Sequence, residues 1–449
     1  MAEPRFGTDG VRGVANEELS ADLALRLGVA AAHVLGRREP DRRVVVGRDT
    51  RLSGDMLEAA LTAGLTSMGW EALRVGVVPT PGVSRIAVSA GAAAGIVISA
   101  SHNPFADNGI KFFGADGHKL SNAVEGEIEE AMGAWETLPR SRPGSIGRSR
   151  DEHRLVHDYL RQVRGTAPAR LEGLKLVLDC ANGATHALAP ALFAELGAGV
   201  TAIHAEPDGV NINEGCGSTC PADLCARVRE DGADAGLAFD GDGDRVMLCD
   251  ARGEVVDGDR MMAICALAMQ RRGELPADVV VATIMSNAGL DVALERHGIR
   301  LERTDVGDRY VAEAMERLGA AIGGEQSGHL LLPRLTPTGD GMVTALQVLG
   351  EMRRAGKPLA DLAAVVEPCP QVLRNVRVRD RGGWERVPAI REAVRRARSR
   401  LGRPEWLSVR TSGTEPLVRV MAQDPDAGRV AEVVDGLCAL IHQHCGASA

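Results

Sequence analysis

The stretch "RVVVGRDTRLSGDMLEAALTAGLTSMGWEALRVG" at residues 43–76 decides the fold class of the chain. It opens with a β-branched apolar run, crosses a polar turn into a segment rich in alanine and leucine, and closes with a second apolar run. Large apolar side chains of the middle segment share one face at helical spacing, at Leu57, Leu61, Leu65 and Met68. The stretch therefore predicts a strand, a helix and a second strand.

The same pattern returns twice, at residues 174–204 and at residues 278–305. Its strands are continuous apolar runs, which is typical of sheets covered by helices on both faces. The repetition predicts an α/β chain with three related mixed α/β domains around a central cleft.

The remainder of the chain, from about residue 370, is smaller and differently built. It offers strands at 373–379, 406–412 and 417–423, a basic helix from Trp384 to about Arg400, and a final helix. This order predicts a C-terminal α+β domain. Candidate linkers at 138–150, 250–260 and 365–373 give four domains, with boundaries at 1–148, 149–250, 251–366 and 367–449.

Composition and charge exclude several classes of protein. The chain is 45% hydrophobic and 25% charged, as in ordinary globular proteins. Its net charge of -9 gives no electrostatic attraction to DNA, RNA or anionic lipid. The start "MAEPRFGTDG" lacks the pattern of a secretory signal, and the uncharged stretches are shorter than a membrane span. We expect a cytoplasmic protein without nucleic-acid or membrane partners.

Nine cysteines are scattered over the last 270 residues. Their odd number and the lack of paired spacing argue against a disulfide framework. Only Cys216, Cys220 and Cys225 cluster, without a CxxC step and without a histidine at zinc-finger distance. Free thiols are favoured, and a soft-metal site is the alternative.

The segment "FDGDGDRV" at 239–246 is the strongest local signal for chemistry. Asp240, Asp242 and Asp244 alternate with glycines, and in an extended loop such side chains point the same way. Three carboxylates on one side repel unless a cation lies between them, and oxygen ligands suit Mg²⁺ or Ca²⁺. Arg245 and Ala251 stand where an EF-hand needs Gly and Glu. An acidic surface turn is the alternative.

Two further segments are weaker signals. "RTSGTEP" at 410–416 follows a strand and gathers hydroxyls, a glycine and Arg410, which suits a phosphate. "GGEQSGH" at 323–329 places Glu325, Ser327 and His329 on one face of a strand-like segment, which suits sugar hydroxyls. A plain turn in the first segment and a hairpin turn in the second are equally open.

A strand also ends in polar residues at "GIVISASHNPFADNGIKFF", residues 95–113. Ser101 and His102 are neighbours whose side chains diverge on an extended segment, so they do not suggest a nucleophile and its base. In isolation Ser101 is a turn or cap residue; beside a metal loop and a phosphate loop, it suits a phosphoryl carrier. Lys111 is one of only four lysines among 52 basic residues. A lysine pKa can be lowered by neighbouring cations whereas arginine stays charged, so Lys111 is a candidate general base.

Seven motifs together resemble the α-D-phosphohexomutase superfamily nearly end to end. They are "FGTDGVRG" at 6–13, "ISASHNP" at 98–104, "DGDGDR" at 240–245, "VGDRYV" at 306–311, "GGEQSGH" at 323–329, "TGDG" at 338–341 and "RTSGTEP" at 410–416. The first motif and Gln326 favour the branch that acts on glucosamine phosphates. One departure is Cys220, where many relatives have histidine.

The resemblance implies a role for each candidate residue. Ser101 resembles the phosphoserine, and Ser101, Asp240, Asp242 and Asp244 resemble the Mg²⁺ ligands. The charged residues around the transferring phosphate correspond to Arg12, Lys111, Arg245 and His329, and His102 is a further catalytic candidate. The segment from Thr304 to Gly307, with Glu325 and Ser327, resembles the sugar-recognition site. The family's loop that holds the non-transferred phosphate corresponds to Arg410, Ser412, Gly413, Thr414 and Arg419.

The resemblance also implies the reaction. It is the interconversion of glucosamine 6-phosphate and glucosamine 1-phosphate, with Mg²⁺ and catalytic amounts of glucosamine 1,6-bisphosphate or a similar hexose bisphosphate. This isomerase would feed UDP-N-acetylglucosamine and bacterial cell-wall precursors. A phosphoglucomutase or phosphomannomutase, a sugar phosphatase and a non-catalytic sugar-phosphate sensor are the alternatives, and a homodimer is open.

Overall fold

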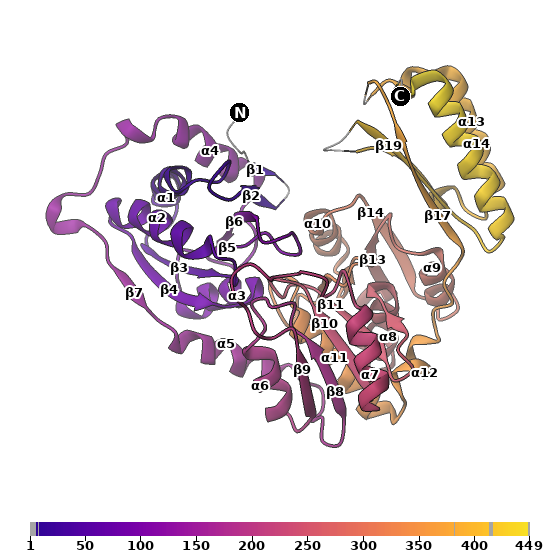
Figure 1. The fold of residues 1–449 in the computed structure, drawn as a ribbon, viewed down its shortest axis with the longest axis horizontal. Helices are drawn as coiled ribbons and strands as arrows, with labels where there is room; N and C mark the ends of the chain where they lie inside the picture. The colour runs from indigo at the N-terminus through magenta and orange to yellow at the C-terminus, as the bar shows by residue number, and fades with distance from the viewer. Residues whose placement is uncertain (1–5, 8, 381, 413–415, 448–449) are drawn as a thin grey trace.

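The computed structural model describes residues 6–7, 9–380, 382–412 and 416–447. Their strands form four sheets, of seven, five, four and three strands, in chain order. Figure 1 shows the first three domains side by side, and the fourth, in yellow, beyond the third and apart from the first. The predicted fold class, three related α/β domains and a smaller C-terminal domain, is confirmed.

The three strand–helix–strand repeats are present as predicted. In each repeat the two strands pair in parallel: β3 (Arg43–Arg48) with β4 (Glu71–Val77), β8 (Lys175–Asp179) with β9 (Gly199–Ile203), and β13 (Val279–Thr283) with β14 (Arg300–Thr304). The helices between them are α2 (Gly54–Ser67), α6 (Leu188–Glu195) and α9 (Ala288–Glu295).

The first sheet has helices on both faces. Its strand order is β1 (Phe6–Gly7), β2 (Gly10–Val14), β6 (Asp107–Gly114), β5 (Ala94–Ile98), β3, β4 and β7 (Ser149–Asp151). The further helices are α1 (Ala21–Leu35), α3 (Thr80–Ala90), α4 (Asn122–Gly133) and α5 (Arg154–Gly165). In β3, Val44 and Val46 enter one core and Val45 enters the other, as alternation along a strand requires.

The second and third sheets complete the α/β part. The second sheet runs β12 (Val255–Val256), β11 (Val246–Asp250), β10 (Ala235–Phe239), β8 and β9, with α7 (Ala222–Asp231). The third runs β14, β13, β15 (Gly323–Gly324) and β16 (Leu330–Leu331), with α8 (Gly258–Arg271), α10 (Asp308–Leu318), α11 (Gly341–Ala355) and α12 (Leu359–Ala363). Since β10 is parallel to β8, the loop 240–245 leaves the carboxyl edge of this sheet.

The fourth sheet is antiparallel and has its own core. Its order is β17 (Gln371–Arg377), β19 (Leu417–Gln423) and β18 (Leu407–Thr411), with α13 (Pro388–Arg400) and α14 (Ala427–Cys445). The basic helix predicted from Trp384 begins instead at Pro388, because proline favours the first helical turn. Trp384–Arg386 forms a short 3₁₀ helix, as do Trp135–Thr137, Pro143–Ser145, Pro276–Asp278 and Pro404–Trp406.

The predicted domain boundaries stay predictions. Two short strands lie just beyond them: β7 pairs with β4 of the first sheet, and β12 pairs with β11 of the second. Among the described residues, no helix is both long and apolar enough to span a bilayer.

Candidate active site

Ser101 lies in the turn after β5, with a backbone φ of 53°, in the left-handed region. Its Oγ donates a 2.6 Å hydrogen bond to Asp240 Oδ2, and the residue is 1% exposed. His102 Nδ1 lies 3.3 Å from the same Oγ. The expectation that these neighbours diverge is wrong, because the segment is a turn at Ser101 and not an extended strand.

Two side chains from different domains hold the carbonyls of this turn. The buried guanidinium of Arg51 donates to the carbonyls of Ser101 and Asn103, at 2.9 and 2.8 Å. Asp49 Oδ2 accepts from Arg51 Nε at 2.9 Å. From the second domain, Asn213 Nδ2 donates to the same two carbonyls, at 2.9 and 3.0 Å. The position of Ser101 is therefore fixed by both domains.

The three aspartates of residues 239–246 converge as predicted, although the loop is a turn and not extended. Asp240, Asp242 and Asp244 each place a carboxylate oxygen within 4.8 Å of the others. The turn closes through Gly243, whose φ is 71° and whose N–H donates to the carbonyl of Asp240 at 3.1 Å. At Gly241, a Cβ would lie 2.6 Å from the carbonyl oxygen of Ser101, so only glycine permits this close approach.

The carboxylates of this turn fit a hard divalent cation. Asp242 Oδ1 and Asp244 Oδ1 are buried, and no hydrogen-bond partner reaches them from the part of the chain that the structure describes. Burial, followed by the charges of Asp242 and Asp244, raises the pKa of Asp240 well above its usual range. A bound cation relieves this repulsion, and a set of oxygen donors suits Mg²⁺ or Ca²⁺.

Lys111 lies beside the aspartates, but its electrostatic environment is opposite to the expected one. Its Nζ is 2.9 Å from Asp242 Oδ2 and 3.0 Å from Asp9 Oδ2, and the side chain is 2% exposed. Although burial acts to lower the pKa of Lys111, the carboxylates of Asp242 and Asp9 raise it above the usual value. The expectation of a pKa lowered by neighbouring cations is therefore wrong, because carboxylates surround this ammonium group.

A chain of charges continues from Lys111 to the third domain. Asp9 Oδ1 pairs with Lys119 Nζ at 2.6 Å, and Lys119 Nζ pairs with Asp308 Oδ2 at 2.7 Å. His329 lies between Asp244 and Asp308, with nitrogen–oxygen distances of 3.5 and 3.8 Å. Burial acts to lower the pKa of His329, but the charges of Asp244 and Asp308 raise it overall. The chain connects the first and third domains at the site.

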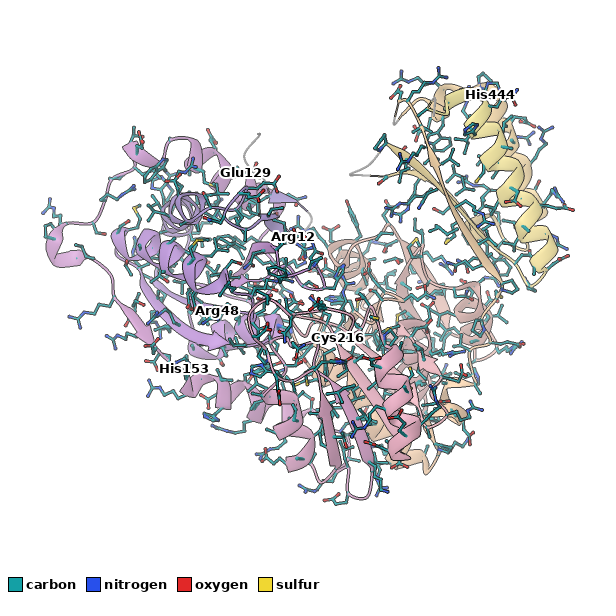
Figure 2. The ribbon with its side chains drawn as sticks, in the orientation of Figure 1. Arg12, Arg48, Glu129, His153, Cys216 and His444 are labelled. Atoms are coloured by element: carbon teal, nitrogen blue, oxygen red, sulfur yellow. The ribbon has the colours of Figure 1, made fainter. Side chains whose placement is uncertain are left out.

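Two arginines lie close to this centre. Arg245 Nε is 3.7 Å from Asp244 Oδ1, and its backbone N–H donates to Asp240 Oδ1 at 3.2 Å. Arg12 pairs with Asp9, and Figure 2 shows it on the side of the first domain that faces the rest of the chain. Burial, then the charges of Arg245 and Arg12, lowers the pKa of His102. Positive charge thus faces the Ser101 turn.

The predicted sugar-recognition residues come together in the third domain. Glu325 Oε1 accepts from the backbone N–H of Gly307 at 3.2 Å, and Glu325 Oε2 accepts from Ser327 Oγ at 3.3 Å. Residues 325–329 form the turn between β15 and β16, so the strand-like interpretation is wrong and the hairpin alternative is right. His329 lies beside Asp244 and Asp308. Thr304 ends β14, and its Oγ1 donates to the carbonyl of Asp305.

The predicted phosphate loop belongs to the fourth sheet. Arg410 and Arg419 are direct partners across β18 and β19. Burial, followed by the charge of Arg419, lowers the pKa of Arg410. Two like charges facing each other destabilise a sheet unless an anion binds between them. Ser412 follows β18, and its N–H donates to the carbonyl of Leu417. Gly413 and Thr414 lie outside the described residues.

Comparison with known proteins assigns the family. Models of the phosphoglucomutase/phosphomannomutase α/β/α domains I, II and III match residues 3–138, 157–253 and 257–369, and that of the C-terminal domain matches 373–440. A phosphoglucosamine mutase of Heliobacterium modesticaldum is 51% identical over 96% of this chain and 98% of its own. The chain belongs to the phosphoglucosamine mutases. It is thus an enzyme, an isomerase of the phosphohexomutase class.

Solved structures show the same fold for this mutase. A phosphoglucomutase/phosphomannomutase family protein of Burkholderia thailandensis has a TM-score of 0.81 and 23% identity, with 97% of both chains covered. The N-acetylphosphoglucosamine mutase of Aspergillus fumigatus, in complex with GlcNAc-6P and magnesium, has a TM-score of 0.69 and 17% identity. The match covers 99% of this chain and 96% of that one.

Some residues at the site of this mutase were not among the sequence candidates. Asp9, Lys119 and Asp308 form the charge chain, and Arg51 and Asn213 hold the Ser101 turn. A signal for three of them was available: Asp9 and Asp308 lie inside quoted motifs, and Lys119 is one of the four lysines. Arg51 and Asn213 stand in ordinary polar turns, and only the three-dimensional structure brings them to Ser101.

Proposed function

We propose that this mutase interconverts glucosamine 6-phosphate and glucosamine 1-phosphate through phospho-Ser101 and glucosamine 1,6-bisphosphate, with Mg²⁺. The observation that carries the proposal is the 2.6 Å hydrogen bond from Ser101 Oγ to Asp240, within a triad of buried carboxylates. The name of the relative with 51% identity supports glucosamine phosphate as the substrate.

The triad and a phosphoryl group on Ser101 would hold the metal ion. The unpartnered oxygens of Asp242 and Asp244 support this role, as does the magnesium in the Aspergillus fumigatus complex. When bound, Mg²⁺ neutralises charge on the phosphoryl oxygens. The triad oxygens leave room for further oxygen ligands, which Mg²⁺ takes from water and phosphate.

The first transfer begins when the free hydroxyl of the sugar phosphate attacks phosphorus on Ser101. The new phosphorus–oxygen bond forms as the bond to Ser101 Oγ breaks, and the hydroxyl proton passes by way of a phosphoryl oxygen to Ser101 Oγ, which leaves as a neutral hydroxyl. Phosphoryl transfer depends mostly on positioning and on neutralising charge. Lys111, Arg245 and Arg12 supply fixed positive charge here, and the raised pKa values of Lys111 and His329 favour their protonated forms.

The bisphosphate then turns over and returns its other phosphate to Ser101. Throughout, Glu325 and Ser327 hold sugar hydroxyls, with the Thr304–Gly307 segment beside them. The fourth domain holds the phosphate that is not being transferred, with Arg410, Ser412 and Arg419 and with Gly413 and Thr414 of the same loop. These residues must bind either phosphate of the sugar.

The test is phosphorus NMR of the protein with Mg²⁺, a trace of hexose bisphosphate, and each of glucosamine-, glucose- and mannose-6-phosphate. We expect the 1-phosphate to form fastest from glucosamine 6-phosphate. Faster turnover of glucose or mannose phosphate would replace the substrate assignment. Release of inorganic phosphate in place of isomer would indicate a phosphatase.

Three further properties are proposed with this function. The four domains end near residues 148, 250 and 366, which limited proteolysis would test. The protein acts in the cytoplasm, where it feeds UDP-N-acetylglucosamine synthesis, and cell fractionation would locate it. Sedimentation of the purified chain distinguishes a monomer from the homodimer that the resemblance leaves open.

A further inference from the structure

A second group of metal-ligating side chains lies at the carboxyl edge of the second sheet. Asp179 is the last residue of β8, His204 follows β9, and Cys216 lies in the loop before α7. One ligand atom from each lies within 4.8 Å of the others. Asp179 and Cys216 are fully buried, and Figure 2 labels Cys216 near the middle of the molecule. The proposed mechanism uses none of these three residues.

The positions of the donor atoms suit one shared cation. His204 Nδ1 lies 3.2 Å from Asp179 Oδ1. Bonds of about 2.0 Å to Zn²⁺ place two tetrahedral ligands about 3.3 Å apart, so this separation fits a common metal ion. This separation also suits an ion pair, and the hydrogen bond to Asp179 is the main cause that raises the pKa of His204. A metal ion would displace the proton of Nδ1 to solvent and take its place.

Charge and orientation support the same conclusion. Among the residues that the structure describes, Asp179 has His204 as its ion-pair partner, and no arginine or lysine comes within 4.0 Å of its carboxylate. A second carboxylate, Asp223, approaches His204 Nε2 at 3.6 Å. Backbone N–H groups of Ala181 and Gly217 donate to Asp179 at 2.9 and 2.8 Å, as outer-shell donors orient a ligating carboxylate.

We propose that Asp179, His204 and Cys216 bind Zn²⁺ or a similar borderline divalent cation, at a site separate from the aspartate triad. A thiolate, an imidazole and a carboxylate together favour Zn²⁺ over Mg²⁺, which prefers oxygen donors. A water molecule completes four-fold coordination. Binding displaces the thiol proton of Cys216 to solvent.

The site would stabilise the loop next to the catalytic aspartates. The N–H of Ser218, two residues after Cys216, donates to the carbonyl of Phe239 at 2.9 Å. Phe239 directly precedes Asp240. A metal at Cys216 would therefore restrain the end of β10, where the triad begins, without touching the substrate.

Cobalt titration of the full-length protein tests the proposal, with Mg²⁺ present in excess to occupy the triad. We expect one equivalent of Co²⁺ to produce a thiolate-to-cobalt charge-transfer absorption, which added Zn²⁺ abolishes. The triad contains no sulfur and cannot produce this band. Its absence from the unmodified protein would overturn the proposal.

Two variants and a control test the ligands Cys216 and His204. Cys216→Ser should lose the charge-transfer band, and His204→Gln should weaken Co²⁺ binding by more than about tenfold. Cys438→Ser, a partly exposed thiol in α14, is the matched control and should bind as the unmodified protein does. A band that survives in Cys216→Ser, or unchanged affinity in His204→Gln, contradicts the site. Since His204 is 27% exposed, its variant remains informative if Cys216→Ser fails to fold.

Discussion

The first three domains and the fourth differ in how they are joined to the rest of the molecule. One continuous cluster of buried apolar residues passes from the first domain through the second and third, from Val45 through Phe239 to Leu346. The fourth domain has a separate core built from its own sheet and its two helices. It joins the third through contacts such as Gln423 Nε2 to the carbonyl of Ser286, the ion pair of Arg403 with Glu295, and the buried Trp406, whose Nε1 donates to Asp291.

This difference matches the two tasks of the reaction. Ser101 must keep its position against Asp240, and buried hydrogen bonds from two domains fix it there. In the proposed function, the arginine pair of the fourth domain binds either phosphate of an intermediate that turns over. A domain with its own core can move as a unit while the reacting centre stays fixed.

The largest effect is expected at Ser101. Ser101→Ala removes the phosphoryl carrier, so mutase activity should fall by more than about 10³-fold while sugar phosphate still binds. Intact-protein mass spectrometry should show at most one phosphate per chain, absent from this variant. Ser89→Ala, an exposed serine in α3, is the control and should keep both activity and phosphate. Full activity in Ser101→Ala would contradict the covalent mechanism.

The next effect is expected at Asp242, which touches Lys111 and Thr80 as well as the proposed metal site. Asp242→Asn keeps the shape and removes one charge, so kcat should fall by about 10²- to 10³-fold with the fold retained. The Mg²⁺ concentration that gives half-maximal activity should be higher in Asp242→Asn than in the control Asp116→Asn, whose aspartate is exposed. Activity that withstands both EDTA and this substitution would mean that the aspartates form only a turn.

Substitution of Lys111 tests whether the site beside Ser101 needs only a positive charge or the compact shape of an ammonium group. Its ammonium group fits between Asp242 and Asp9, and a guanidinium cannot occupy the same 2.9 and 3.0 Å contacts. We expect Lys111→Arg to lower kcat by about 10²-fold with KM little changed, whereas the exposed Lys357→Arg is silent. Because carboxylates raise the pKa of Lys111, its ionisation should not appear in the pH–rate profile near neutrality. A kcat within a few-fold of the parent would show that positive charge alone suffices.

The sequence predicted which residues to consider near Ser101 more completely than it predicted how those residues are arranged. Alternation of Asp240, Asp242 and Asp244 with glycine was enough to predict a cation site, although the loop is a turn. The pKa of Lys111 could not be predicted, because Asp9 and Asp242 are distant in sequence and only folding brings them to the ammonium group. The same holds for Arg51, which contacts carbonyls about fifty residues away. Local patterns identify strands, helices and motifs, whereas pairing across domains depends on the whole chain.

In the fourth domain, replacing Arg410 should weaken substrate binding more than it slows phosphoryl transfer. A charge-assisted hydrogen bond contributes about 1.5–3 kcal/mol, so Arg410→Ala should raise KM by roughly 10- to 100-fold. The change in kcat should be smaller than that in Lys111→Arg. Arg374→Ala, on exposed β17 of the same sheet, is the matched control. A loss in kcat with KM unchanged would place Arg410 with the reacting centre and weaken the division between the two regions.

The smallest effect concerns stability at the junction between the third and fourth domains. Asp259 Oδ2 accepts from the backbone N–H of Asn287, the residue whose side chain reaches Cys369, and the Asp259 carboxyl is buried. Burial, followed by the charge of Asp257, raises the pKa of Asp259 from 3.8 to about 7. A carboxyl with a pKa raised by folding stabilises the protein below its unfolded pKa, and this contribution is lost as pH rises through the folded value.

The unmodified protein should therefore lose stability between about pH 4 and pH 7 through Asp259, by at most about 4 kcal/mol. Asp259→Asn keeps an acceptor for Asn287 and cannot ionise. The free energy of unfolding of this variant, relative to that of the unmodified protein, should therefore increase as pH rises across this range. Denaturant unfolding of both proteins at pH 5 and pH 8 measures the difference, which cancels the titration of all other groups. An equal difference at the two pH values would show that Asp259 is ionised in the folded protein throughout, and that the junction tolerates a buried charge.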